Sequence, residues 1–256
     1  MYTGSTCEDN SLPIHSRHEP LHPDLHGYLE TLGSGTYIRH PFCNEMILDI
    51  DRCGSIHQHI DFLVGRSDAC FENQDWEGYL QCVAAPHQPV YFEKDQDQFG
   101  DEQYWRLLRE VYDNQKFTYY QQNRFNRLLR STRPGRENLM SPEERALLAR
   151  LPDELTVYRG FSDDGCRTYA KGIAWTLDER QAVSYAMQFP DEGEPEVIRG
   201  RIRKQDVWAI NGTTLLLPPE KVFGRQTRYA GSEKDVQMMR DRCKAPFDIE
   251  KLIQGK

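Results

Sequence analysis

The hydrophobic period of this chain changes at about residue 153, and this change constrains the fold more than any other feature. From residue 101 to 150, apolar side chains recur every three or four residues, as in amphipathic helices. After residue 153, short apolar and β-branched runs alternate with turn residues. Helices that are followed by a series of strands are typical of the α+β class. We therefore predict an α+β fold.

Local patterns place the expected elements. Residues 141–144, Ser-Pro-Glu-Glu, predict a helix start with Ser at the N-cap, Pro at the first helical position and Glu144 three residues past the cap. Residues 89–93, Pro-Val-Tyr-Phe-Glu, predict a strand because they are β-branched and aromatic. In the C-terminal half, strands are expected at 155–158, 172–176, 196–202, 207–210 and 214–217, and helices at 178–189 and 232–243.

Three regions follow from these patterns. Residues 1–35 are rich in Pro, His, Gly and Ser and are expected to form a flexible arm. Residues 36–136 are expected to be mixed and helical, and residues 137–256 to form the domain that holds the strands. Prolines 20 and 23 interrupt the histidines of the arm, so no metal site is predicted from these histidines: His15, His18, His22 and His26.

Composition indicates which kinds of partner and which cellular compartment to expect. The 256-residue chain carries 40 acidic and 32 basic residues and a net charge of −8, which disfavours general nucleic-acid binding. Its seven cysteines show no two-residue spacing, a usage that indicates a reducing compartment. No secretory signal and no apolar stretch of ~20 residues is evident, so no membrane association is expected. We expect a cytoplasmic protein, in the cell that makes it or in a host.

Two strand ends carry residues that suit ligand binding. Arg159 ends one strand and precedes Gly160; its guanidinium fork suits phosphate, and the glycine would let a ligand approach the backbone. The structural alternative is an exposed charge or half of a salt bridge. Trp175 and Thr176 end the next strand, where an aromatic ring and a hydroxyl can line a pocket. Their structural alternative is core packing by Trp175 and helix capping by Thr176 or Asp178.

The combination of these segments resembles the arginine-type ADP-ribosyltransferases, most closely their small phage and bacterial members. The resemblance covers roughly residues 137–222 and is carried by Tyr-Arg-Gly at 158–160, Gly-Ile-Ala-Trp-Thr-Leu-Asp at 172–178, and the helix that follows with Ala182 and Tyr185. It implies a split β-sheet, preceded by a mixed and helical N-terminal region, with NAD as the substrate bound between the two half-sheets.

The resemblance also implies residue roles. Arg159 would contact the phosphates or ribose of NAD, with Tyr158 and Gly160 beside it. Thr176 would hold the nicotinamide ribose, next to Trp175. We therefore expect the Arg159 guanidinium, the Trp175 indole and the Thr176 hydroxyl to line one shared crevice sized for a dinucleotide. Transfer would pass through an oxocarbenium-like sugar cation as nicotinamide leaves, and a nearby carboxylate would stabilise that charge.

This chain departs from the carboxylate motif of the family. The family carries Glu-x-Glu just before an apolar strand, whereas residues 211–214 of this chain read Asn-Gly-Thr-Thr. Thr213 or Thr214 therefore stands where the glutamate is expected, and threonine cannot carry the negative charge. Glu220 is the candidate replacement, with Glu233 as another; alternatively, Glu220 caps the turn after the prolines.

The implied function is a mono-ADP-ribosyltransferase that modifies a protein or nucleic-acid target, in a phage-encoded protein acting on host factors. The alternative is a catalytically inactive protein of the same fold that acts as an inhibitor or interaction module. NAD glycohydrolysis, 2′-phosphate transfer and a purely structural role are the further readings. By analogy with multi-region transferases, residues 1–100 would select the target.

Overall fold

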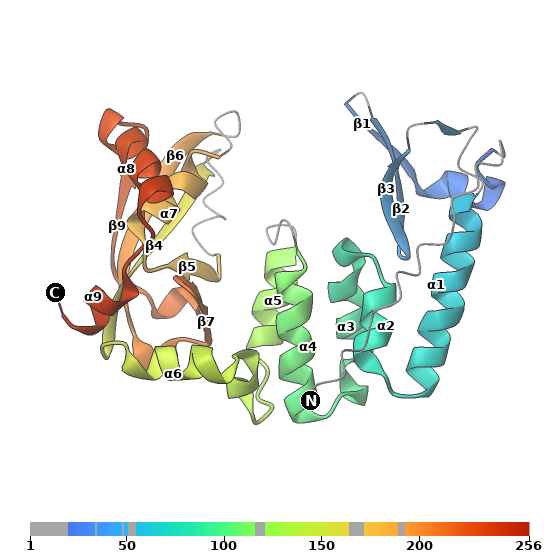
Figure 1. Ribbon diagram of the computed structural model, residues 1–256, viewed down its shortest axis with the longest axis horizontal. Coiled ribbons are helices and arrows are strands. Elements are labelled where there is room, and N and C mark those ends of the chain that lie inside the picture. Colours follow the sequence, from blue (N-terminus) through green and yellow to red (C-terminus); the bar gives the residue numbers. More distant parts are fainter. Residues whose placement is uncertain are drawn as a thin grey trace, which may run out of the picture. The chain divides into compact units, whose positions relative to one another are not determined.

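The computed structural model describes residues 20–33, 35–47, 49–50, 55–115, 121–163, 172–188 and 193–255. The chain forms two compact units, Met1–Lys94 and Asp95–Lys256 (Figure 1). The sequence placed a boundary at residues 136 and 137, but residues 95–136 group with the C-terminal unit. The helices of this segment form hydrogen bonds and ion pairs with later residues, including Glu144 and Glu220, which explains the difference.

The N-terminal unit combines a small sheet with helices. Its sheet is an antiparallel meander in the order β1-β2-β3. Ile38, on β2, is fully buried in an apolar cluster that also contains Ile60 from the helix α1. The elements of this unit are a 3-10 helix Pro23–Tyr28 (η1), β1 Leu29–Leu32, β2 Gly35–His40, β3 Cys43–Ile47, α1 Ser55–Glu72, α2 Trp76–Cys82, a 3-10 helix Ala85–His87, and α3 Gln88–Asp95, which continues across the unit boundary.

The expected flexible arm is wrong for its described part. Residues 1–19 lie outside the described residues, but residues 23–32 form η1 and β1. Leu21 and Leu25 are each 3% exposed in the apolar cluster, and the Leu21 amide donates to the Ile50 carbonyl at 2.9 Å. Burial of these two leucines fixes a segment whose composition is typical of a loop.

The strand expected at residues 89–93 is also wrong, because these residues lie in α3. Pro89 occupies the first turn, where a missing N–H costs no helical hydrogen bond. The buried Gln88 side chain donates to the carbonyls of Leu80 and Val83, each at 3.1 Å, and thereby fixes the helix start. Aromatic and β-branched content indicates burial here, and tertiary packing decides the conformation.

The C-terminal unit opens with helices, and the N-cap predicted at Ser141 is confirmed. Ser141 accepts from the Glu144 amide while the Glu144 carboxylate accepts from the Ser141 amide, which completes a capping box. The helices before the sheet are a 3-10 helix Gln96–Gln98, α4 Asp101–Asp113, α5 Gln122–Leu129, a 3-10 helix Arg136–Leu139, and α6 Pro142–Arg150.

A six-stranded antiparallel sheet forms the centre of this unit, in the order β7-β8-β5-β4-β6-β9. β4 pairs with β6 along its whole length, but it pairs with β5 only at Tyr158 and Thr176. Two three-stranded groups therefore meet at one residue pair. The remaining elements are β4 Glu154–Asp163, β5 Ala174–Thr176, α7 Glu179–Ala186, β6 Glu194–Arg203, a 3-10 helix Lys204–Asp206 (η9), β7 Ala209–Asn211, β8 Thr214–Leu216, a 3-10 helix Pro219–Lys221, β9 Phe223–Tyr229, α8 Glu233–Lys244 and α9 Ile249–Ile253.

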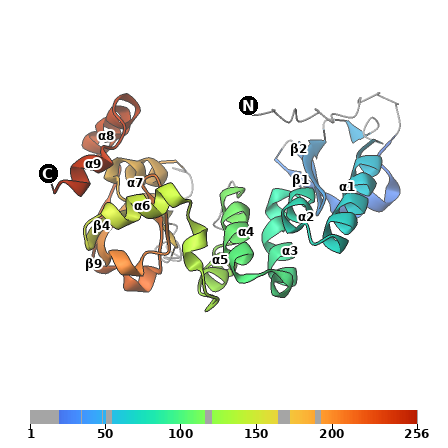
Figure 2. The ribbon, with the colours of Figure 1, turned by 60° about the horizontal axis from the view of Figure 1, so that its bottom comes forward.

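Helices cover both faces of this sheet. α7 and α8 pack together on one face, where Ala182 and Val197 belong to a small apolar cluster. Leu147 and Leu148 of α6 and residues of α9 pack against the larger cluster on the other face. α6 crosses one end of the sheet (Figures 1 and 2). The mixture of helices with open antiparallel sheets confirms the α+β class.

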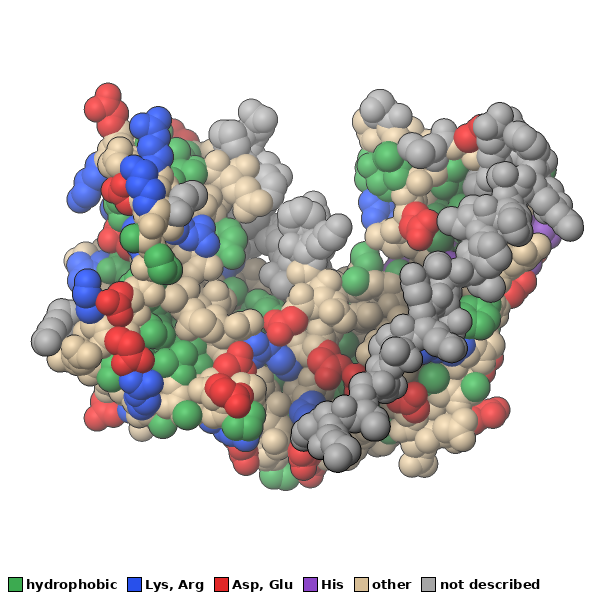
Figure 3. All heavy atoms as spheres, in the orientation of Figure 1, with side chains coloured by type: hydrophobic (Ala, Val, Ile, Leu, Met, Phe, Trp, Pro, Cys, Tyr) green, Lys and Arg blue, Asp and Glu red, His purple; other side chains and the backbone are tan. Residues whose placement is uncertain are grey.

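In the part of the chain that the structure describes, no helix has both the length and the apolar character needed to cross a membrane. Acidic and basic side chains are interspersed over the visible face of the C-terminal unit (Figure 3).

Candidate functional site

Arg159 projects from the middle of β4 toward the larger apolar cluster. Successive side chains of a strand point to opposite faces of the sheet. Val157 and Phe161 belong to the larger cluster, whereas Tyr158 packs against the small cluster beside α7. Arg159 is therefore on the face of Val157 and Phe161, and its burial is intermediate.

The guanidinium of Arg159 lies against the backbone just before β5. Its Nη1 donates to the Ala174 carbonyl. A Cβ built on Gly172 would lie 1.9 Å from Nη2 and 2.0 Å from Cζ of Arg159. The space beside the buried Gly172 backbone is thus filled by the guanidinium, and only a glycine at position 172 permits this arrangement.

Trp175 meets the same backbone segment from β5. Its indole Nε1 donates to the Gly172 carbonyl at 2.9 Å, and its ring is 2% exposed within the larger apolar cluster. The structure therefore brings Arg159 and Trp175 together around Gly172. The indole itself is part of the core, which is the alternative that the sequence analysis gave for Trp175.

Thr176 points to the opposite face, beside Tyr158, its cross-strand partner. The Thr176 hydroxyl donates to Gln181 Oε1 at 2.8 Å and accepts from the Asp178 amide at 3.1 Å. Asp178 is the N-cap of α7. Thr176 thus connects β5 to the start of α7. The Thr176 hydroxyl therefore does not share a crevice with Arg159 and Trp175, so the expectation of one shared crevice is wrong for this residue.

Gln181 forms hydrogen bonds with the threonines at the positions where the sequence resemblance led us to expect a Glu-x-Glu motif. The Thr213 hydroxyl donates to Gln181 Oε1 at 2.7 Å, and Gln181 Nε2 donates to the Thr214 hydroxyl at 3.4 Å. Together with Thr176 these residues form a neutral cluster, which we call the threonine–glutamine cluster. Sequence reasoning assigned no role to Gln181, since its contacts join residues up to 33 positions apart.

Gly160 serves helix packing. A Cβ at this position would lie 1.7 Å from the Ala182 carbonyl oxygen of α7. The backbone that approaches Gly160 is therefore that of α7, whereas the sequence reading expected a ligand there. Ser162, on the same face, donates to the Ala186 carbonyl at 3.0 Å and completes this strand–helix contact.

Glu220 is held by an arginine of α5's C-cap. Both of its carboxylate oxygens accept from Nη2 of Arg130, at 2.6 and 2.7 Å, and both side chains are about half exposed, at 50% and 44%. Partial burial opposes ionisation of Glu220, but the hydrogen bond from Arg130, a backbone hydrogen bond and the charges of Arg130 and Lys221 together outweigh it and lower the pKa of the carboxyl group. Glu220 is ionised and paired, and no contact in the described part of the chain joins it to Arg159.

Burial shifts the pKa values of Arg159 and Tyr158, which are adjacent on β4, in opposite directions. Burial lowers the pKa of the Arg159 guanidinium to about 10, and the Tyr112 hydroxyl of α4 acts in the opposite direction. Because this pKa is still well above 7, the guanidinium stays cationic at neutral pH. Burial, followed by the charge of Glu179, raises the pKa of Tyr158, which therefore stays protonated. Arg159 therefore places a positive charge on its face of the sheet, within electrostatic reach of Tyr112.

A groove of about 740 Å³ opens elsewhere in the C-terminal unit, between α6, the start of β4 and η9. None of the predicted site residues lines it, and its charged residues have both signs: Arg145, Asp153, Glu154, Arg203 and Lys204. Lys204 uses its ammonium group to bind the Ala149 and Leu151 carbonyls at the end of α6, at 3.2 and 2.6 Å. The groove therefore carries no coherent charge that would select a ligand.

Comparison of the chain with protein-family models, with curated proteins and with solved structures gave no match. The candidate site is thus defined by its own geometry: Arg159 and Trp175 around Gly172 on one face of the sheet, and Tyr158 with the threonine–glutamine cluster on the other.

Proposed function

We propose that the C-terminal unit is an NAD-binding module of ADP-ribosyltransferase type, and that it transfers ADP-ribose to a protein or nucleic-acid acceptor. The observation that carries this proposal is the placement of a cationic Arg159 guanidinium against Gly172, just before β5, the strand at which the two three-stranded groups of the sheet meet through a single residue pair. A sheet joined so narrowly suits the split sheet that the sequence resemblance implies.

Arg159 suits the phosphates of NAD in both charge and shape. Its planar guanidinium offers several N–H donors, and its partial burial strengthens an interaction with an anion by lowering the local dielectric. The contacts with Gly172 and the Ala174 carbonyl hold the guanidinium in place before any ligand arrives, so binding costs little side-chain entropy. In the transfer step, the bond between ribose C1′ and nicotinamide breaks, and the acceptor forms the new bond at C1′.

NAD-dependent thermal stabilisation of the full chain tests this function. A ligand that binds only the folded state adds about 2.7 kcal/mol at 100 times its dissociation constant. We expect a shift in Tm for the wild type and its loss in Arg159→Ala. Arg150→Ala removes an exposed arginine paired with Glu250 and is the matched control. An equal shift in all three proteins, or none in the wild type, would reject the proposal.

Radiolabelled NAD and a cell lysate then test transfer. Label on a protein or nucleic acid supports the transferase, whereas free nicotinamide without a labelled acceptor indicates NAD hydrolysis.

A second candidate is an inactive module of the same fold that acts as an inhibitor or interaction protein. The neutral threonine–glutamine cluster favours it, because a glutamate is implied at Thr213 or Thr214 and Glu220 is paired with Arg130. For this candidate, purified protein binds a partner stoichiometrically, the complex survives Arg159→Ala, and neither label transfer nor free nicotinamide is detected.

A further inference from the structure

Two histidines and a carboxylate that are distant in sequence converge in the N-terminal unit. One donor atom from each of His22, Asp24 and His57 lies within 4.8 Å of the others. The two imidazole rings are 4.1 Å apart, centroid to centroid. His22 is the N-cap of η1, Asp24 lies in its first turn, and His57 lies in the first turn of α1.

A fourth residue, Asp61, contacts His57 from outside this cluster. His57 Nδ1 lies 3.0 Å from Asp61 Oδ2, one helical turn further along α1. A carboxylate beside one nitrogen of an imidazole keeps the proton there and leaves the lone pair of the other nitrogen for a metal. The Asp61 contact therefore orients His57 with Nε2 as its donor.

Neighbouring packing fixes the backbone on both sides of this cluster. Leu21 and Leu25 flank His22 and Asp24, and both are buried in the same apolar cluster as Ile60 of α1. The donors thus project from two segments that share a core. His22 Nδ1 accepts from the Asp24 amide at a long 3.4 Å and lies 3.7 Å from Asp24 Oδ2, so a cation can compete for this nitrogen.

We propose that His22, Asp24 and His57 bind one divalent transition-metal ion, with Zn²⁺ as the best match. Two imidazoles and a carboxylate suit zinc, whereas calcium and magnesium prefer oxygen ligands alone. Donors at about 2.0–2.2 Å from a tetrahedral zinc lie roughly 3.3–3.6 Å apart, so small side-chain rotations close the observed spacing. The Asp24 and Asp61 carboxylates offset the charge of the ion.

The site has an open position and is reachable from solvent. Three protein donors leave the fourth tetrahedral position for water or an added ligand. The side chains of His22, Asp24 and His57 are 46%, 81% and 32% exposed. A bound ion would join the segment before β1 to α1, and it would stabilise the N-terminal unit through this cross-link.

Zinc titration of the metal-stripped full chain tests the site, with a chromogenic chelator as competitor. We expect one equivalent of Zn²⁺ in the wild type and an affinity lowered at least tenfold in His22→Ala, His57→Ala and Asp24→Asn. The last variant changes only a largely exposed side chain, so it tests the donor without disturbing the core. Asp61→Asn should weaken binding by about 10–100-fold, as outer carboxylates do in known sites. His59→Ala, on the exposed side of α1, is the matched control and should bind as the wild type does.

Cobalt substitution separates this site from the seven cysteines of the chain. Nitrogen and oxygen ligation gives ligand-field bands without the intense near-ultraviolet thiolate charge transfer, and circular dichroism verifies that each variant is folded. Absence of binding, a thiolate spectrum, or unchanged affinity in folded Asp24→Asn and His57→Ala would overturn the proposal. Since the proposed NAD site lies in the other unit, neither result depends on the other.

Discussion

Gly160 and Gly172 show how one residue type serves two different purposes near the same strand. A side chain at position 160 would meet the backbone of α7, whereas a side chain at position 172 would meet the end of the Arg159 side chain. A backbone atom cannot move without its helix, but a guanidinium can rotate away. Identical substitutions at these two positions should therefore have opposite consequences for stability and for ligand binding.

We expect Gly172→Ala to displace the Arg159 guanidinium with little loss of stability, and to abolish the NAD-dependent thermal shift as Arg159→Ala does. Gly160→Ala should instead lower the free energy of unfolding by about 1–3 kcal/mol or more, because it overpacks the contact between β4 and α7. Denaturant unfolding with and without NAD measures both effects. If Gly172→Ala retains the full NAD response, Arg159 does not act from the position described.

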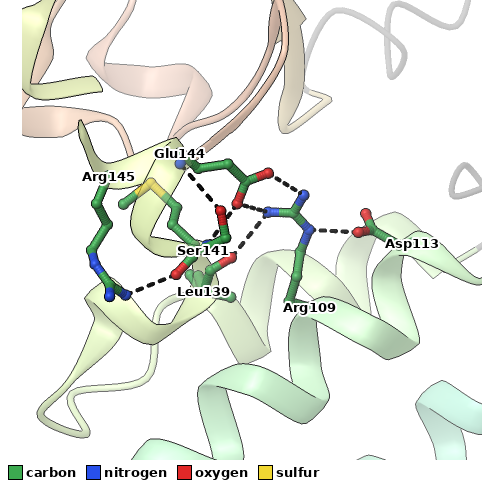
Figure 4. Close-up of polar contacts among 7 residues, drawn as sticks. Arg109, Asp113, Leu139, Ser141, Glu144 and Arg145 are labelled. Atoms are coloured by element: carbon green, nitrogen blue, oxygen red, sulfur yellow. Dashed lines mark hydrogen bonds and ion pairs between the residues drawn. The ribbon is translucent and has the colours of Figure 1, made fainter. Parts of the chain in front are cut away.

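At the scale of elements, a buried ionic contact joins the helical part of the C-terminal unit to the start of α6 (Figure 4). Arg109 of α4 binds Glu144 at 3.0 Å, Asp113 at 2.7 Å and the Leu139 carbonyl at 2.9 Å. Glu144 also caps the Ser141 amide at 2.9 Å. Only 14% of the Arg109 side chain and 20% of the Glu144 side chain are exposed, so water screens this contact weakly.

Glu144→Ala should lower the free energy of unfolding by about 2–4 kcal/mol, since it takes one of two carboxylate partners, Glu144 and Asp113, from a mostly buried guanidinium and removes a helix cap. Glu250→Ala breaks an exposed pair with Arg150 and should cost under about 1 kcal/mol. Urea unfolding of the full chain compares the two variants. Equal losses would show that the buried contact contributes no more than the exposed one.

At the scale of the whole molecule, the unit boundary at residues 94 and 95 makes α4 and α5 part of the sheet-containing unit. Trp105 of α4 is fully buried and donates to the Pro134 carbonyl at 2.8 Å, and the Arg136 guanidinium lies 5.3 Å from its ring centroid. Leu139, which leads into α6, is 1% exposed. A cut at residue 137 would separate Arg109 from the Leu139 carbonyl and from Glu144, and it would separate Arg130 from Glu220.

We therefore expect residues 95–256 to fold alone with a cooperative thermal transition, and residues 137–256 to lose that transition. The shorter fragment lacks Arg109, Trp105 and Arg130, so Glu144 and Glu220 lose their partners and apolar surface becomes exposed. Circular dichroism melts and amide proton dispersion compare the two fragments. Cooperative folding of 137–256 would instead favour the boundary that the sequence suggested.

Sequence alone determined the features that depend on neighbours along the chain. The capping box at Ser141 and Glu144 and the α+β class follow from local spacing, because caps and hydrophobic periods are read within a few residues. The same reasoning misassigned residues 89–93, where β-branched and aromatic side chains reflect burial in α3 and short runs do not specify a period.

Only the tertiary structure decided which residues meet. Trp175 and Thr176 are adjacent in sequence but lie on opposite faces of the sheet, since strand side chains alternate, and only Trp175 shares the face of Arg159. His22 and His57 are 35 positions apart in the chain and become neighbours because Leu25 and Ile60 share a core. Contacts of this kind are set by packing between distant elements, and no local pattern of residues encodes them.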